Sequence, residues 1–306
     1  MEVDVVIPSW NKAELLASCL DHLARQTIPH RVIVADNGSQ DGTVAMVRER
    51  FPDVKLVELD ENVGFGRAVN RAAEAGDGEA IVVLNNDVNP EPPFLAELVA
   101  PLARDNGVGM VSGVLLDPAT GLIDAAGVEV DGGLAGYAYM GGLDASELRS
   151  PSPGLLGPCG GAAAYRRRAF ESLGGFDERI FVYSEDLELA LRLRADGWRC
   201  ELAPGARGMH LGSATLGARS VAQVRLAAWS RGYVLGRYRV GLSWLLMEIG
   251  VTMVDLLVLR SAAPLERVRG WRVGRSLSRR PISEESVSPS LGRLSGLRRR
   301  LRAARR

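Results

Sequence analysis

The sequence predicts an α/β fold built on a Rossmann-like, mostly parallel sheet with helices on both faces, followed by a C-terminal helical extension. Through the first 115 residues, short runs rich in Val and Ile alternate with segments of helical period, which is the pattern of βα units. The composition, 46% hydrophobic and 24% charged, is that of a globular protein and excludes a disordered or disulfide-stapled chain. At 306 residues, we expect one main domain with an extension.

The elements can be assigned in chain order. Val3–Ile7 is predicted to be a strand, and Asn11 with Glu14 resembles a capping box that opens a helix with a buried stripe at Leu15, Leu16, Cys19, Leu20 and Leu23. The next elements are strand Arg31–Ala35, helix Thr43–Arg50, strand Lys55–Leu59, helix Arg67–Ala75, strand Ala80–Leu84, helix Pro93–Arg104 and strand Gly109–Val114.

The pattern changes after this point. From about residue 115 to 160, Gly-rich stretches predict loops and short antiparallel strands. A helix at Glu185–Asp196, a strand near Arg199–Leu202 and a glycine-punctuated loop around His210–Gly217 follow. We therefore expect a main domain over residues 1–217, C-terminal helices over 218–262 and a flexible, Arg-rich tail over 263–306.

Polar clusters follow four of the predicted strands. They are Pro8-Ser-Trp-Asn11, Asp36-Asn-Gly-Ser39, Asp60-Glu-Asn-Val-Gly64 and Asn85-Asn-Asp87. Each one alone is also typical of a turn. Ligands of open α/β sheets bind outside the carboxyl ends of the strands, so four clusters on one edge favour a binding site.

Asp87 is the candidate metal ligand. It follows the apolar strand Ile81-Val-Val-Leu84, and carboxylate and amide oxygens are the ligands that hard divalent cations prefer. A metal held there would neutralise charge that grows on a diphosphate leaving group. The alternative is a structural turn that leads into Pro90. His210 lies in a glycine-flanked loop and also has two interpretations: a metal ligand or a surface histidine.

Glu185 and Asp186 begin a predicted helix. Acidic residues in a first turn often only compensate the helix dipole. A carboxylate pair at an enclosed helix start is also a plausible general base, because burial and like charge raise one pKa toward neutral pH. The sequence leaves both interpretations open.

Taken together, these motifs resemble the family 2 inverting glycosyltransferases of the GT-A fold, and in particular their bacterial rhamnosyltransferase-like branch. The resemblance spans roughly residues 3–217. Its carriers are Val5-Val-Ile-Pro-Ser-Trp-Asn11, Ala35-Asp-Asn-Gly-Ser-Gln-Asp-Gly42, Asn62-Val-Gly-Phe-Gly-Arg-Ala-Val-Asn70, Leu84-Asn-Asn-Asp87, Gly174-Gly-Phe-Asp177, Tyr183-Ser-Glu-Asp186, Gly197-Trp198 and His210.

The resemblance implies a role for each motif. The donor nucleotide sugar would be bound by Pro8, Ser9, Asn11, Asp36, Gly38, Asn62, Gly64, Arg67, Asn85 and Asn86. Mg²⁺ or Mn²⁺ would be held by Asp87 and His210, with Asn85 in place of the first Asp of the usual metal motif. Asp186 would be the catalytic base, and Glu185, Gly160, Gly161 and Trp198 would shape the acceptor side.

The resemblance also implies the substrates. We expect dTDP-rhamnose as donor, with a UDP- or GDP-hexose as the alternative, and a glycan or polyprenyl-diphosphate-linked acceptor in cell-wall or surface-polysaccharide synthesis. A sugar nucleotidyltransferase is a more distant alternative. For such an enzyme we would expect a Gly-rich, basic phosphate loop after the first strand. Pro8-Ser-Trp-Asn11 is not such a loop.

The C-terminal region differs in charge from the rest. Residues 260–306 hold 14 Arg against 3 Glu, a balance of +11, so that residues 1–259 carry −11. We expect no nucleic-acid partner, because the main domain is acidic. Leu242–Leu259 is apolar apart from Glu248 and Asp255, which disfavours a full membrane span.

Two alternatives stay open for this stretch: an interfacial helix on an anionic membrane, or a helix packed on the main domain. The first residues, Met-Glu-Val-Asp, show no basic region followed by an apolar stretch, so we expect no secretory signal, and the three cysteines lack metal-ligand spacing. We therefore expect a cytoplasmic protein, with peripheral attachment to the inner face of the cell membrane if the first alternative holds.

Overall fold

The computed structural model describes residues 1–148, 151–211, 220–257, 263–282, 286–288 and 291, with the backbone alone for 254–257. The strands are β1 (Val3–Ser9), β2 (Arg31–Asp36), β3 (Lys55–Glu58), β4 (Ala80–Leu84), β5 (Val88–Pro90), β6 (Val108–Leu116), β7 (Ile123–Ala125), β8 (Val128–Val130), β9 (Gly136–Ala138), β10 (Ala162–Arg166) and β11 (Arg199–His210). The helices are α1 (Ala13–Leu23), α2 (Thr43–Arg50), α3 (Phe65–Glu74), α4 (Phe94–Arg104), α5 (Arg167–Ser172), α6 (Glu185–Ala195), α7 (Val221–Arg237), α8 (Leu242–Leu257) and α9 (Ala263–Ser276), with a 3₁₀ turn at Ala145–Glu147.

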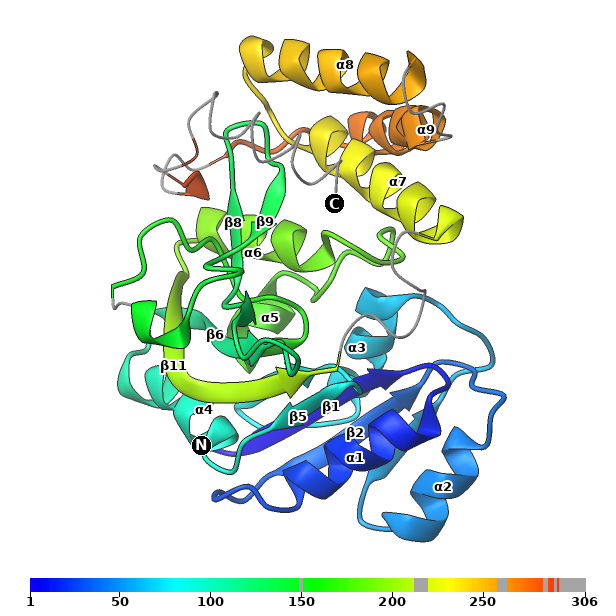
Figure 1. Ribbon diagram of the computed structural model, residues 1–306, viewed down its shortest axis with the longest axis vertical. Coiled ribbons are helices and arrows are strands. Elements are labelled where there is room, and N and C mark those ends of the chain that lie inside the picture. Colours follow the sequence, from blue (N-terminus) through cyan, green and yellow to red (C-terminus); the bar gives the residue numbers. More distant parts are fainter. Residues whose placement is uncertain (149–150, 212–219, 258–262, 283–285, 289–290, 292–306) are drawn as a thin grey trace.

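A nine-stranded sheet forms the centre of the molecule (Figure 1). Its order is β3-β2-β1-β4-β10-β6-β11-β5, and β7 pairs with β6 off this path. β1 is parallel to β2 and β4, β2 to β3, and β6 to β11, whereas β10 and β5 run antiparallel to their neighbours. The predicted α/β fold with a mostly parallel sheet is confirmed.

Helices cover both faces of the sheet, as predicted. Along β1, Val5 and Ile7 pack with α1 and α4 on one face, while Val6 packs with α3 and α6 on the other. β4 alternates in the same way, with Val82 on the first face and Val83 on the second. Central strands that are buried on both faces have continuous apolar sequences, and their positions were therefore predicted well from the sequence.

The start of α1 differs from the prediction. The N-cap is Lys12, in a left-handed conformation at φ 64° and without a side-chain cap bond, so the predicted capping box at Asn11 is wrong. The Asn11 Oδ1 instead accepts a hydrogen bond of 2.8 Å from the backbone N–H of Gln40. Asn11 therefore ties the loop after β1 to the loop after β2.

The second half of the sheet was predicted less completely. β11 does not end near Leu202 but continues to His210, with a register shift between Leu202 and Arg207. Its last residues pair antiparallel with β5, with His210 opposite Val88. Most of the expected loop around His210–Gly217 lies outside the described residues, which omit 212–219.

The C-terminal extension is helical, as predicted, and forms a layer at one end of the molecule with α8 outermost (Figure 1). A Cβ placed on Gly232 of α7 would lie 1.9 Å from the carbonyl oxygen of Arg267, and one on Gly270 of α9 would lie 2.0 Å from that of Trp229. The two helix backbones are thus in direct contact, which only glycine permits here. Residues 263–276, expected to belong to a flexible tail, are therefore a packed helix, and 292–306 lie outside the described residues.

Candidate active site

The carboxyl ends of three adjacent strands form the floor of the site. β1, β2 and β4 are neighbours and parallel, so the polar clusters that follow them meet at one edge. The backbone N–H of Asn37 donates to the Ser9 carbonyl at 2.7 Å, and Asn86 Nδ2 donates to the buried Ser9 Oγ at 3.1 Å. Three of the four predicted clusters are thereby fixed to one another by hydrogen bonds.

A cavity of about 310 Å³ opens at this edge, a size typical of small-molecule sites. Eight predicted site residues line it: Pro8, Ser9, Asn62, Gly64, Asn85, Asn86, Asp87 and His210. Six further lining residues were not predicted: Trp10, Asn37, Phe65, Phe181, Val182 and Tyr183. Trp10 and Asn37 lie inside motifs already singled out and could have been found, whereas Phe181 and Val182 reach the cavity only through tertiary packing.

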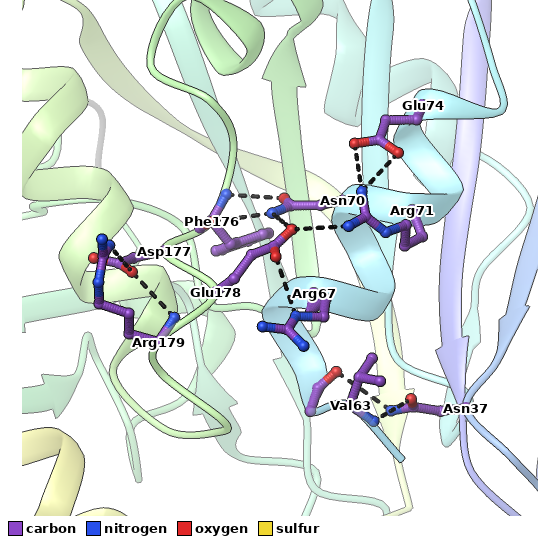
Figure 2. A network of polar contacts seen from close by, with 11 residues as sticks. Asn37, Val63, Arg67, Asn70, Arg71, Glu74, Phe176, Asp177, Glu178 and Arg179 are labelled. Atoms are coloured by element: carbon purple, nitrogen blue, oxygen red, sulfur yellow. Dashed lines mark hydrogen bonds and ion pairs between the residues drawn. The ribbon is translucent and has the colours of Figure 1, made fainter. Parts of the chain in front are cut away.

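Asn37 organises the wall that faces β2. Its Nδ2 donates to Asn62 Oδ1 at 3.0 Å. Its Oδ1 accepts from the backbone N–H of Val63 at 2.9 Å, a contact drawn in Figure 2. Gly64 follows at φ 92°, and a Cβ there would lie 2.4 Å from the carbonyl oxygen of Phe181. A side chain at this position would push away the segment that forms the opposite wall.

Asp36 lies at the end of β2 and is buried. Its Oδ2 accepts from the backbone N–H of Ser39 at 3.0 Å, while its Oδ1 has no hydrogen-bond partner among the described residues. Gly38, at φ 75° against the backbone of Glu61, shapes the same turn. Asn11, Asp36 and Gly38 adjoin the cavity rather than line it.

Asp87 and His210 meet because β5 pairs with the end of β11. His210 Nε2 lies 3.5 Å from Asp87 Oδ1, and His210 Nδ1 lies 2.7 Å from Oδ2 of Asp124 on β7. Burial alone would lower the pKa of His210, but the hydrogen bond to Asp124 and the nearby charge of the Asp87 carboxylate outweigh it and raise the pKa to about 10. Asp124 orients the ring, and no signal in the sequence pointed to it.

The Asp87 and His210 pair fits one end of a metal site. Asp87 is 5% exposed and lines the cavity, and its Oδ1 accepts no hydrogen bond within the described part of the chain, so a carboxylate oxygen is free to bind a cation there. Across the described residues, no group of three or more His, Cys, Asp and Glu is arranged to hold a metal ion. Any metal here would take its remaining ligands from a bound molecule or water, as Mg²⁺ does when it bridges substrate phosphates.

Glu185 and Asp186 stand at the first turn of α6, as predicted. The two residues before them, Tyr183 and Ser184, have φ of 69° and 66°, which is strained for residues other than glycine. Ser184 makes no side-chain cap bond to the helix. The strained entry directs the Asp186 carboxylate to the backbone N–H groups of Leu187, at 2.7 Å, and Gly160, at 3.0 Å.

The two carboxylates differ in their partners. Burial raises the pKa of Glu185, and the charge of Asp186 raises it further, while one Glu185 oxygen has no hydrogen-bond partner among the described residues. Burial also raises the pKa of Asp186, but the hydrogen bonds from Leu187 and Gly160 oppose this shift. Since donated hydrogen bonds favour the charged form, Asp186 is the member of the pair that ionises first.

Two glycines of the predicted acceptor side connect the carboxylate to the cavity. A Cβ on Gly160 would lie 3.3 Å from the Phe65 ring, which lines the cavity, and 3.8 Å from Asp186 Oδ2. Gly161 accepts from the backbone N–H of Asn85 at 3.3 Å. Asp186 and Asn85 therefore both contact the Gly160-Gly161 segment, and Phe65, which lines the cavity, lies against the same segment.

Arg67 and Trp198 lie elsewhere. Arg67 donates to Glu178 at 3.1 Å and lines a different cavity, and Figure 2 shows its side chain extending from α3 toward that of Glu178. Trp198 packs over Gly109 and beneath Arg168, at the opposite end of β6 from the polar clusters. The structure therefore corrects the predicted placement of Arg67 in the donor pocket and of Trp198 on the acceptor side.

A family model and two relatives with known names match this chain. The family model described as Glycosyl transferase family 2 matches residues 4–174. The O-antigen biosynthesis protein RfbC of Myxococcus xanthus is 34% identical over 227 residues, 70% of this chain and 18% of the relative. The N-acetylglucosaminyl-diphospho-decaprenol L-rhamnosyltransferase of Mycobacterium tuberculosis is 32% identical over 206 residues, 60% of this chain and 66% of the relative. The matched region thus spans less than two thirds of either relative.

A solved structure agrees with the fold. The mannosyltransferase PcManGT of Pyrobaculum calidifontis, in complex with GDP-Man and Mn²⁺, superposes with a TM-score of 0.57 at 23% identity, covering 99% of this chain and 79% of that chain. At this identity the likeness concerns the fold, and it confirms the predicted GT-A-type architecture.

Proposed function

We propose, since the chain belongs to glycosyltransferase family 2, that it transfers a sugar from a nucleoside-diphosphate donor to a hydroxyl group of a glycan or lipid-linked glycan. The observation that carries this proposal is the placement of the Asp186 carboxylate, through Gly160 and Phe65, beside a cavity that Asp87 and His210 line. A base and a candidate metal site thus border the same space.

The residues of the sheet edge would bind the donor. Asp36, with an unpartnered buried oxygen, would accept a hydrogen bond from the nucleoside, and the loops of Ser9, Asn37 and Asn62 would enclose it. Asp87 and His210 would hold Mg²⁺ or Mn²⁺, which would neutralise charge on the departing diphosphate. Asn85, linked to Gly161, would face the sugar between the metal end and the base.

Asp186 would act as general base. Ionised and fixed by two backbone N–H groups, it would accept the proton of the acceptor hydroxyl as that oxygen attacks the anomeric carbon. Attack from the face opposite the diphosphate inverts the configuration in one displacement. Glu185, whose pKa is raised by burial and by the charge of Asp186, would remain protonated and neutral at the start of the reaction.

For the substrates we propose dTDP-rhamnose as donor and a polyprenyl-diphosphate-linked sugar as acceptor. The support is the name of the Mycobacterium tuberculosis relative, an L-rhamnosyltransferase that acts on N-acetylglucosaminyl-diphospho-decaprenol. A UDP- or GDP-hexose is the second candidate, because PcManGT was solved with GDP-Man.

A transfer assay tests this proposal. The purified chain, Mn²⁺ and N-acetylglucosaminyl-diphospho-polyprenol would be incubated with dTDP-rhamnose, UDP-glucose, UDP-galactose or GDP-mannose in turn. We expect a rhamnosylated lipid whose new linkage, by NMR, has the anomeric configuration opposite to that of the donor. Retention of configuration would contradict the role of Asp186. Transfer from another donor alone would identify that donor in place of dTDP-rhamnose.

We further propose that α8 lies on an anionic lipid surface. Its residues Leu242, Leu246, Ile249 and Met253, spaced along one helical face, are 47–71% exposed. Glu248 points the other way, where Arg231 holds it at 2.8 Å and Arg267 at 3.6 Å, so its charge does not oppose contact with lipid. No described helix is long and apolar enough to cross a membrane.

Flotation of the full chain with vesicles of phosphatidylglycerol and phosphatidylcholine tests this placement. We expect the doubly substituted Leu246→Glu, Ile249→Glu chain to stay behind while wild type floats. Val221→Glu, at a residue 72% exposed on α7, is the matched control and is expected to float. Equal flotation of all three chains would contradict the proposal.

A further inference from the structure

A second cavity, of about 520 Å³, lies between the catalytic domain and the C-terminal extension. Ten residues line it, and five of them are arginines against two carboxylates. Arg67 comes from α3, Arg179 from the loop after α5, Arg192 from α6, Arg237 from the end of α7 and Arg280 from the segment after α9. We call this the arginine cavity.

Three of these arginines already have a carboxylate partner. Arg67 Nε lies 3.1 Å from Glu178, and a guanidinium nitrogen of Arg179 lies 3.1 Å from Asp177 (Figure 2). Arg192 Nε lies 2.7 Å from the buried Glu188. The positive charges of these three are therefore compensated within the protein.

The other two arginines are not compensated. Arg237 is 9% exposed and donates to the neutral carbonyl of Ser278, and its Nε is buried without a hydrogen-bond partner among the described residues. The Arg280 guanidinium has no hydrogen-bond or ion-pair partner within the described ranges. A guanidinium held near the interior without a counter-charge is costly, so an anion from solution would stabilise this arrangement.

The surroundings add to the positive potential. Arg279, next to Arg280, has a pKa lowered first by burial and then by the like charges of Arg275 and Arg239. Its Nε is also buried without a hydrogen-bond partner in the described part of the chain. Excess positive charge thus gathers where the extension closes over the catalytic domain.

We propose that the arginine cavity binds a phosphate or diphosphate group between Arg237 and Arg280. Guanidinium groups present paired donors that match phosphate oxygens, and two of them suit a doubly charged anion. The cavity volume lies within the usual range of small-molecule sites. The group has two sources, free phosphate or pyrophosphate and the diphosphate of a lipid-linked acceptor, and only the second rests on the proposed function.

Calorimetric titration with pyrophosphate in EDTA tests the site. EDTA removes divalent metal ions, so the metal-dependent diphosphate binding proposed for the first cavity does not contribute to the measured heat. We expect wild type to bind, and Arg280→Gln to bind roughly tenfold or more weakly because a charge-assisted contact is lost. Arg272→Gln on α9 removes the same charge from an exposed residue outside the cavity and is expected to bind like wild type.

Two results would overturn the proposal: no binding by wild type, or equal weakening in the Arg280 and Arg272 variants. If Arg280→Gln fails to fold, Arg280→Lys gives the same comparison, since it keeps the charge and loses the paired donors.

The transfer assay then separates the two sources. A raised KM of Arg280→Gln for the diphosphate-linked acceptor, with an unchanged KM for the donor, identifies the acceptor diphosphate. An unchanged acceptor KM together with weakened pyrophosphate binding identifies free phosphate or pyrophosphate. A wild-type chain that transfers no sugar would count against the proposed function, while the pyrophosphate result would still decide this site.

Discussion

The two cavities of this protein have opposite electrostatic character. The cavity at the sheet edge has buried carboxylate oxygens without hydrogen-bond partners in the described structure at Asp36, Asp87 and Glu185, which line it or adjoin it. The arginine cavity has the two uncompensated guanidinium groups of Arg237 and Arg280. The first suits a cation or a hydrogen-bond donor, and the second suits a bare anion.

One segment of chain separates them. Residues 177–179 line the arginine cavity and 181–183 line the sheet-edge cavity, so the stretch between α5 and α6 forms a wall of both. The donor side is fixed by backbone hydrogen bonds within the sheet domain, whereas the arginine side depends on the docking of α7 and α9. We expect substitutions to affect the two cavities separately.

Asp186→Asn is expected to have the largest effect. Loss of a general base lowers kcat by about 10²–10⁴-fold, while binding of the nucleoside diphosphate stays near wild type because Asp186 lies outside the sheet-edge loops. Steady-state transfer and calorimetric nucleotide binding measure the two effects. A near wild-type kcat would remove Asp186 from the base role.

Gly232→Val is expected to break the extension and spare the donor side. The added side chain meets the Arg267 carbonyl, and forcing α7 from α9 costs about 1–3 kcal/mol or more of the free energy of unfolding. We expect a lower melting temperature and lost pyrophosphate binding, with metal-dependent donor binding retained. Gly250→Val on α8, where a Cβ meets nothing within 4 Å, is the control. Equal loss of both binding activities would contradict separate cavities.

Asp124→Asn is expected to weaken only the donor side. The carboxylate orients His210, and removal of such a partner typically costs about 10–100-fold in metal affinity. Mn²⁺-dependent donor binding measured by calorimetry is expected to fall within that range. Pyrophosphate binding in EDTA is expected to stay unchanged, and unaltered Mn²⁺ dependence would show that Asp124 does not orient a metal ligand.

Glu185→Gln is expected to have the smallest effect on sugar transfer, and its signature is a pH dependence of stability. The folded-state pKa of Glu185 is raised from 4.5 to about 8, first by burial. Its protonation therefore contributes stability that is full below pH 4.5 and is lost as pH rises through about 8. The difference in melting temperature, variant minus wild type, is expected to increase between pH 5 and pH 8 and to stay constant above pH 8. A difference that does not vary with pH would contradict the raised pKa.

The sequence predicted the sheet edge far better than the extension. Strand ends such as Leu84 followed by Asn85 and Asp87 are local signals, and parallel strands bring them together without further information. Asp124 and Phe181 reach the site through packing between distant segments, which no local pattern encodes. Arg67 and Trp198 were misplaced for the same reason, since a motif fixes the position of a side chain along the chain and not its direction.

The sequence signal for the packing of the C-terminal extension is the spacing of its glycines. Gly232 with Gly236, and Gly270 with Gly274, repeat at four residues, and these repeats allow α7 and α9 to touch. The arginine content of residues 263–306 led to the prediction of a flexible tail, because charge was judged without the partner helix. Glu248, taken as a charge that disfavours burial in a membrane, faces arginines of the extension instead.

The most direct test of the proposed activity is calorimetric binding of dTDP-rhamnose, UDP-glucose, UDP-galactose and GDP-mannose to the full chain, with and without Mn²⁺. The same titrations with Asp87→Asn test the metal end of the cavity. We predict that dTDP-rhamnose binds wild type in the presence of Mn²⁺ and that binding weakens sharply without Mn²⁺ or in Asp87→Asn. Binding of no donor, or binding that neither Mn²⁺ nor Asp87 affects, would contradict a metal-dependent transferase site at this edge of the sheet.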